Sequence, residues 1–128
     1  AGVPLKAYQD TTTGNHSFHS IRAPRLSAVV PQPLETAAAG ADILLHEVYD
    51  ADALARRSDD WQAYHQAAHT SGPDLGTLAN KAQPKHLILH HQLAWDGSKE
   101  AILAQIARSF SGKTTWGEDL MVFELRAD

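Results

Sequence analysis

The feature that most constrains the fold is an amphipathic helical pattern set between two short apolar runs. Apolar residues within 75–82 recur at i, i+3, i+4 and i+7, which is typical of a helix that buries one face. The runs at 43–45 and 87–89 are continuous and apolar, as expected for strands that are covered on both faces. This order of strand, helix and strand predicts an α/β structure with helices packed on a sheet.

The remaining patterns extend this prediction in both directions. We expect further helices at 52–57 and 60–68, and one that opens at Asp96-Gly97-Ser98 and ends before Gly112. Two closing strands are predicted at 114–116 and 120–125, and the second predicted strand of the core covers 86–90. Prolines interrupt the first third of the chain, where we expect short edge strands at 5–9, 17–21 and 26–30 and a brief helix at 34–39. The chain therefore divides into an irregular segment at 1–39, which is compatible with the remnant of a preceding sheet, and a patterned region at 40–128.

Composition narrows the classes of function. The chain has 128 residues, a net charge of −4 and no cysteine, so a single domain fits, and neither a nucleic-acid-coating surface nor a thiolate metal site is expected. No apolar run approaches the roughly 20 residues that span a bilayer, so no membrane partner is expected. The start, Ala1-Gly2-Val3-Pro4, has no initiator methionine and no signal-peptide pattern, from which we expect a processed chain or a fragment in the cytoplasm.

Two histidines in the predicted helix at 60–68 and just after it have the spacing of a zinc protease motif. His65 and His69 are four residues apart, but that motif requires a glutamate beside the first histidine as general base, and Gln66 stands there. Because Thr70 and Ser71 indicate that the helix has ended near His69, we expect the two imidazoles not to share a face. A metalloprotease is therefore disfavoured.

Polar side chains follow the apolar runs of both core strands. Glu47 comes after the run at 43–45, and His90 and His91 end the strand at 86–90. In open α/β sheets, ligands gather at the carboxyl ends of strands, and neighbours in a strand point to opposite faces, so only one of the two histidines can face a given cleft. The alternatives of an acid–base or metal site and of structural histidines stay equally open here. Tryptophans at 61, 95 and 116 are expected to serve in packing.

Four segments carry a specific combination of motifs: Gly40-Ala-Asp-Ile-Leu-Leu-His-Glu-Val-Tyr49, His69-Thr-Ser71, Leu78-Ala-Asn-Lys-Ala-Gln-Pro-Lys85 and Leu87-Ile-Leu-His-His91. With the closing pattern from Phe110 to Leu120, they resemble the C-terminal half of a metallo-β-lactamase-fold hydrolase. The similar subgroup is the one that contains ribonuclease Z and the arylsulfatase-like enzymes. The resemblance implies half of an αββα sandwich, with a mixed sheet and helices on one face, and a two-metal site that usually binds zinc.

The resemblance also implies roles for three residues. His91 matches the last metal-ligand histidine of the family, at the end of a strand. His69 matches the histidine of the His-Thr/Ser motif, and Glu47 matches the acidic residue of the His-Glu motif. In the ribonuclease Z branch that pair is associated with proton transfer to the leaving group.

Most of the family's metal ligands are missing from this sequence. The principal motif, His-x-His-x-Asp-His, does not occur, nor does the Gly-Asp-Thr turn with the bridging aspartate. One expected ligand remains, and open catalytic zinc sites use three protein ligands. We therefore expect a fragment of a phosphodiester or related ester hydrolase that is inactive alone. It would act on a small-molecule ester or a nucleic-acid phosphodiester only in a complete enzyme. The alternative is a non-catalytic interaction module that pairs with the missing N-terminal half or with a second copy through its exposed sheet face.

Overall fold

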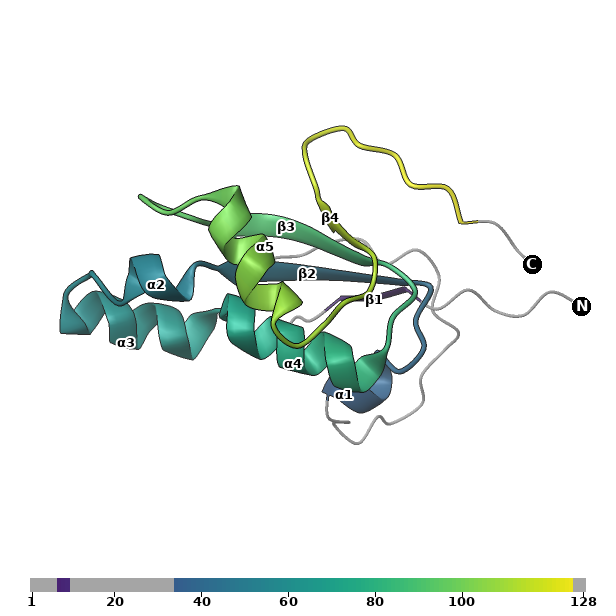
Figure 1. Ribbon diagram of the computed structural model, residues 1–128, viewed down its shortest axis with the longest axis horizontal. Helices are drawn as coiled ribbons and strands as arrows, with labels where there is room; N and C mark the ends of the chain where they lie inside the picture. Colours follow the sequence, from purple (N-terminus) through teal and green to yellow (C-terminus); the bar gives the residue numbers. More distant parts are fainter. Residues whose placement is uncertain (1–6, 10–33, 126–128) are drawn as a thin grey trace, which may run out of the picture.

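The computed structural model describes residues 7–9 and 34–125, which form one parallel sheet and five helices (Figure 1). The strands lie in the order β1 (Ala7–Gln9), β2 (Ile43–Tyr49), β3 (Leu87–Leu93) and β4 (Thr114–Trp116). Each strand pairs in parallel with the next. Sequence order and spatial order coincide, so the sheet grows in one direction as the chain proceeds.

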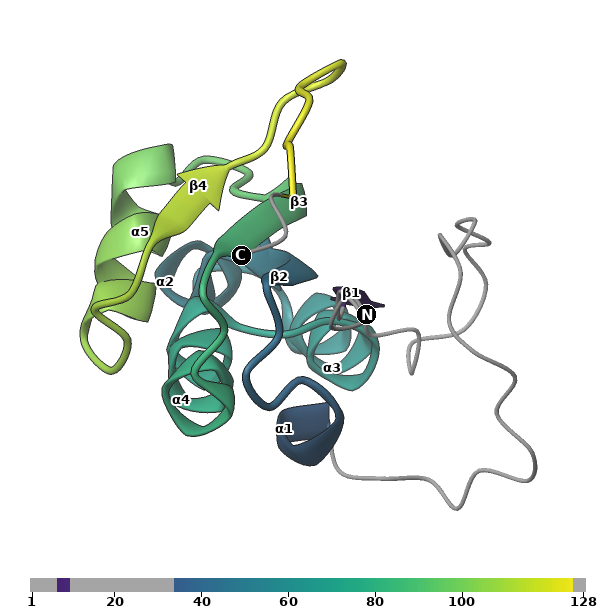
Figure 2. The same cartoon turned by 90° about the vertical axis from the view of Figure 1, so that its right-hand side faces the viewer.

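Helices connect the strands, as parallel pairing requires. They are α1 (Leu34–Ala37), α2 (Ala51–Leu54), α3 (Asp59–Ala68), α4 (Gly72–Ala82) and α5 (Lys99–Ala107). Figure 2 shows α1, α4 and α5 on one face of the sheet, and among the described elements no helix covers the other face. The α/β class and the placement of helices on one face, both predicted from the sequence, are confirmed. Within the described residues, no helix is both long and apolar enough to cross a membrane.

The core lies between this face of the sheet and the helices. Both layers contribute to it, including Leu44, Val48, Leu87 and Leu89 from the sheet, and Leu75, Ala79, Ile102 and Ile106 from α4 and α5. All of them are at most 1% exposed. Burial of apolar surface at about 25 cal/mol per Å² is the main force that holds such layers together.

The ends of α4 and α5 follow from local sequence. Ser71 caps α4, where its hydroxyl accepts from the backbone N–H of Asp74 at 3.2 Å. Gln83 ends the helix in the left-handed conformation, with φ of 50°, and Pro84 follows it. Ser98 caps α5 in the same way, through the N–H of Ala101 at 3.0 Å. The first helix was predicted from its apolar period and the second from its opening at Asp96-Gly97-Ser98, and both are confirmed.

A buried aspartate joins α2 to α5. Asp50 is 1% exposed, and its Oδ1 accepts from the backbone N–H groups of Asp52 and Ala53 at 2.9 and 3.0 Å. The Gln105 amide donates to the same Oδ1 at 2.9 Å, and its carbonyl oxygen accepts from the N–H of Ala51 at 3.1 Å. The polar groups of this turn are therefore satisfied without water, and the helix that follows β2 is fixed to the core.

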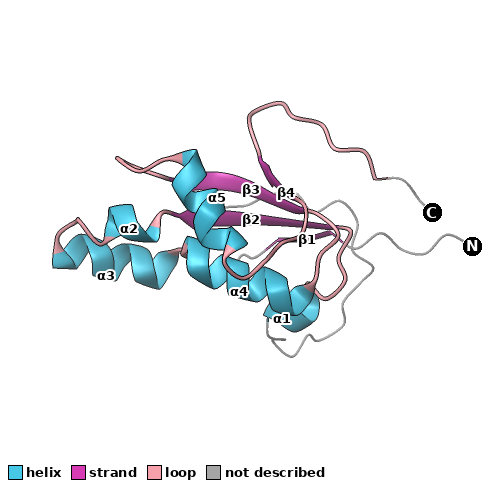
Figure 3. Ribbon diagram, viewed as in Figure 1, coloured by secondary structure: helices cyan, strands magenta, loops and turns pink. Residues whose placement is uncertain are grey.

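The structure differs from the sequence prediction in four respects. The core strands continue past 45 and 90, to Tyr49 and Leu93. Polar residues occupy their ends, so the apolar pattern in the sequence stops before the strand does. Residues 120–125 form no strand and lie in the loop drawn in Figure 3. All described pairings are parallel, so the expected mixed sheet is wrong for this part of the chain. The helix expected at 52–57 ends at Leu54. The strands expected at 17–21 and 26–30 lie outside the described residues.

Gly76 sets how closely α4 approaches α5. A Cβ at this position would lie 2.6 Å from the backbone carbonyl oxygen of Ile106. Gly76→Ala gains about 1 kcal/mol of helix propensity but forces the two backbones apart, at a cost of about 1–3 kcal/mol. We expect a net loss in the free energy of unfolding by urea denaturation, whereas the exposed Lys81→Ala on the same helix stays within about 0.5 kcal/mol of wild type. A Gly76→Ala protein as stable as the parent would show that the helices are not in close contact.

Candidate functional site

The site is built around the carboxylate of Glu47, near the carboxyl end of β2. Its Oε1 accepts from the backbone N–H of Thr70 at 2.6 Å, and its Oε2 lies 3.2 Å from Nδ1 of His69. The side chains of Glu47 and His69 are 11% and 16% exposed, so both are largely shielded from bulk water and a small part of each side chain stays accessible. A carboxylate that accepts two hydrogen bonds in such a place is held in one orientation.

The local backbone brings His69 to Glu47. Helix α3 ends at Ala68, and His69 has extended dihedral angles, with φ of −139° and ψ of 164°. The extended segment runs beside β2, where the Tyr49 N–H donates to the carbonyl oxygen of Thr70 at 2.9 Å and Tyr49 forms a parallel bridge with Ser71. The sequence prediction that the helix ends near His69 is confirmed.

The contact with Glu47 determines what His69 can do. An ionised carboxylate only accepts hydrogen bonds, so the Nδ1 of His69 is the donor. In the neutral ring the lone pair then resides on Nε2, and a proton taken up there leaves a cation beside a carboxylate. This arrangement fixes the tautomer of the imidazole, which suits it to move a proton at Nε2.

His91 lies next to His69 because β3 contains a bulge. Glu47 pairs with His90 and Val48 pairs with Gln92, which leaves His91 as the extra residue. His91 is exposed, and its backbone is in the left-handed region, with φ of 44°. Its ring centroid is 5.4 Å from that of His69. Bulges redirect side chains, and the left-handed backbone conformation costs a non-glycine residue about 1–3 kcal/mol.

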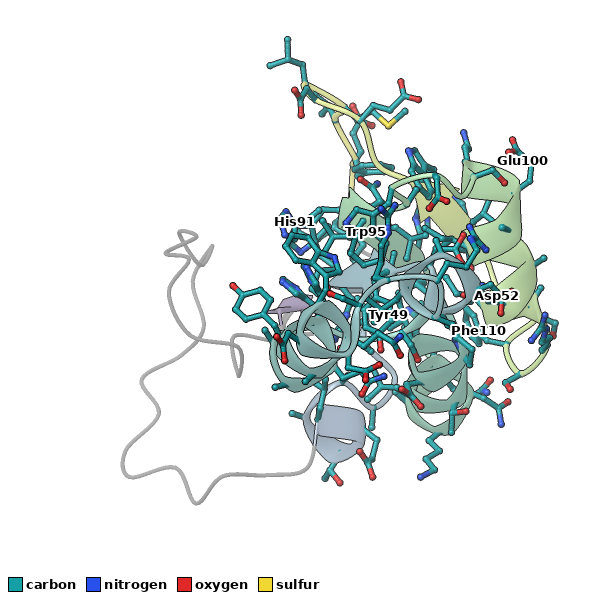
Figure 4. The ribbon with its side chains drawn as sticks, turned by 90° about the vertical axis from the view of Figure 1, so that its left-hand side faces the viewer. Tyr49, Asp52, His91, Trp95, Glu100 and Phe110 are labelled. Atoms are coloured by element: carbon teal, nitrogen blue, oxygen red, sulfur yellow. The ribbon has the colours of Figure 1, made fainter. Side chains whose placement is uncertain are left out.

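The structure thus brings together the three residues singled out from the sequence. His91 was expected at the end of the strand, but it lies at a bulge inside it. In Figure 4 its side chain lies on the same side of the molecule as that of Trp95, which follows β3. The other histidine of the pair, His90, is partly buried. Burial is the main cause that lowers its pKa, and the charges of His46 and His91 lower it further.

His65 is the residue of the site that the sequence interpretation missed. Its ring stacks on that of His69, with centroids 5.4 Å apart and planes 26° from parallel, so the expectation that the two do not share a face is wrong. Rings of Trp61, Tyr64 and Trp95 surround it at 4.7, 5.0 and 5.0 Å. The recurrence of aromatic residues at 61, 65 and 69, four apart, was the signal that could have revealed it.

The three tryptophans, which were expected to pack in the core or over it, lie in different surroundings. Trp61 is 46% exposed and flanks the site rather than packing in the core. Trp95 is left-handed, with φ of 48°, and lies over His65 and Tyr49. Trp116 packs against the core cluster, as predicted.

The described residues do not fit a two-metal centre. No group of three or more histidine, cysteine, aspartate or glutamate side chains among residues 7–9 and 34–125 is arranged to hold a metal ion. Both carboxylate oxygens of Glu47 already accept hydrogen bonds. A catalytic zinc ion requires about three protein ligands, so the described residues lack a complete set of metal ligands.

Comparisons with known proteins identify the fold. No protein-family model and no curated protein sequence matches the chain. Among solved structures, the chain is similar to the metallo-β-lactamase fold protein YhfI from Bacillus subtilis, with a TM-score of 0.54 and 22% sequence identity. The described residues form part of a metallo-β-lactamase fold. The match covers 71% of this chain and 34% of YhfI, so the chain spans about a third of that structure.

The residues that the sequence resemblance indicated are Glu47 near the end of β2, His69 just after α3 and His91 at the bulge in β3. The likeness to YhfI supports the fold expected from the sequence. The narrower resemblance to the ribonuclease Z and arylsulfatase-like subgroup stays a prediction.

The geometry predicts the tautomer of His69. In the neutral ring, long-range ¹H–¹⁵N correlation spectra should show the proton on Nδ1 and a bare Nε2, because Glu47 accepts from Nδ1. Glu47→Ala removes the acceptor and should shift the population to the Nε2–H form. The exposed carboxylate of Glu118 is the matched control, and Glu118→Ala should leave the spectrum unchanged. A neutral His69 with its proton on Nε2 in the unaltered chain would contradict the hydrogen bond.

Proposed function

We propose that the chain provides the Glu47–His69 proton-transfer pair of a metal-dependent hydrolase with a metallo-β-lactamase fold, acting on phosphodiester or related ester bonds. The observation that carries the proposal is the contact of 3.2 Å between Oε2 of Glu47 and Nδ1 of His69. It directs Nε2 of His69 away from the carboxylate, toward the place where a substrate can meet it.

The chemistry assigned to the pair is general acid catalysis. In hydrolysis of a phosphodiester, water adds to phosphorus, the bond from phosphorus to the leaving oxygen breaks, and that oxygen takes a proton. Protonated His69 donates this proton from Nε2, and Glu47 stabilises the cation while it exists. The attacking water releases one proton to solvent, and His69 takes one up again before the next turnover. General acid–base groups of this kind contribute about 10²–10⁴-fold to rates.

We further propose that His91 is one ligand of a zinc site completed by groups beyond the described residues. One imidazole does not hold zinc tightly, and the chain spans about a third of YhfI. The remaining ligands would come from an N-terminal half of the sandwich or from a second copy. On this basis, the chain by itself hydrolyses nothing.

The proposal is tested on the tagged chain isolated natively from its source cells with whatever assembles on it. We expect this assembly to hydrolyse bis(4-nitrophenyl) phosphate and to lose that activity on chelation. Glu47→Gln and His69→Asn should lower kcat by about 10²-fold or more with metal content retained, whereas His91→Ala should lower metal content.

The matched control is His86→Asn, at the opposite end of β3, where Nε2 of His86 is 2.7 Å from the Thr115 hydroxyl. This variant should retain metal and full activity. An assembly that turns over after complete chelation, or one unaffected by Glu47→Gln, would overturn the proposal.

A second candidate function is that of a non-catalytic interaction module. The observation in its favour is the apolar segment after β4, where Leu120, Met121 and Val122 are 98%, 45% and 86% exposed. Exposed apolar segments mark interfaces. Stable dimers without metal, together with an assembly that hydrolyses no ester, would favour this function over the first.

A further inference from the structure

His65 is a buried imidazole whose polar atoms are not used. It is 6% exposed, and neither Nδ1 nor Nε2 has a hydrogen-bond partner in the part of the chain that the structure describes. Most buried polar side-chain atoms have such a partner. An aliphatic side chain would fill the same space without this cost, so the flat ring itself requires an explanation.

The surroundings of His65 show what the ring does. Trp61 and Tyr64 flank it from its own helix, with centroids 4.7 and 5.0 Å away. Trp95 meets it edge to face from the loop after β3, at 5.0 Å and 76°. These three rings leave His65 little freedom to turn, and its face lies against His69 with planes 26° apart.

The loop that carries Trp95 is itself anchored. Next to Trp95, the carboxylate of Asp96 accepts from the guanidinium groups of Arg56 and Arg57, with the shorter contact at 2.8 Å. Both arginines precede α3. The loop after β3 and the start of α3 are thus joined beside the rings that surround His65, and this link holds Trp95 against His65.

We propose that His65 is a positioning residue, whose ring face holds the plane of His69 so that Nδ1 stays directed at Glu47. The inference rests on the proposed function, because it concerns how the proton-transfer pair is oriented. The hydrogen bond to Glu47 holds Nδ1 of His69 only while the side chain keeps its χ1 and χ2 angles. The stacked surface of His65 limits changes in both angles and so fixes the direction in which Nε2 points.

The role depends on shape and not on charge or hydrogen bonding. Burial lowers the pKa of His65, and the neighbouring charge of His69 lowers it further, so the ring is neutral near pH 7. Because neither nitrogen has a hydrogen-bond partner among residues 7–9 and 34–125, a phenyl ring provides the same flat surface. The inference therefore predicts that phenylalanine replaces His65 and that side chains without a ring do not.

The test uses the whole chain, labelled with ¹⁵N, and reads the Nδ1–H resonance of His69. His65→Phe should retain this resonance and its slow exchange with water. His65→Leu, which fills the space without a flat face, should broaden it or speed its exchange by about tenfold or more, as expected for a group that has lost its fixed orientation. The exposed neighbour Gln66 provides the control, and Gln66→Ala should change nothing. Circular dichroism spectra check that each variant is folded before the resonance is compared.

In an active assembly, His65→Leu should lower kcat by about tenfold with KM unchanged, and His65→Phe should stay within about twofold of wild type. Loss of the resonance in His65→Phe would mean that a nitrogen is required, and its retention in His65→Leu would mean that volume suffices. Either result overturns the inference. Because the resonance is read on the chain without substrate, failure of hydrolysis alone would overturn the proposed function and leave the positioning role standing.

Discussion

The site depends on the two hydrogen bonds that the Glu47 carboxylate accepts, from the backbone of Thr70 and from the ring of His69. They join the end of β2 to the turn between α3 and α4. Removing the carboxylate would leave a partly buried N–H without a partner, at a cost of about 1–3 kcal/mol. The same bonds select the tautomer of His69, so one side chain couples the path of the backbone to the chemistry of the site.

The fold was largely predictable because its signals are local. Caps at Ser71 and Ser98 and the apolar period of α4 depend on residues within a few positions of one another. The closing segment at 120–125 shows where such signals fail. Its alternating pattern is that of a strand, but a strand exists only when another strand pairs with it, and none of the described strands does so. Pairing is a long-range property that periodicity does not report.

The residues that form the candidate site were predictable only in part, and their geometry was not. Polar residues after two apolar runs indicated that Glu47 and one of the histidines at 90 and 91 lie at one edge of the sheet, and the resemblance singled out His91 and added His69. The bulge at His91 arises from a register shift between β2 and β3, which no residue type in the sequence announces. The place of His65 depends on how the chain bends after Ala68, because an extended His69 can still lie beside the preceding helical turn.

The central claim is that this chain carries the proton-transfer part of a metallo-β-lactamase-fold site without a full set of metal ligands. The most direct test is metal analysis of the purified chain after it has been saturated with zinc and desalted. The account predicts that zinc is not retained in stoichiometric amount, because one imidazole binds it too weakly. Retention of about two tightly bound zinc ions per chain, as in a complete two-metal enzyme, would contradict it.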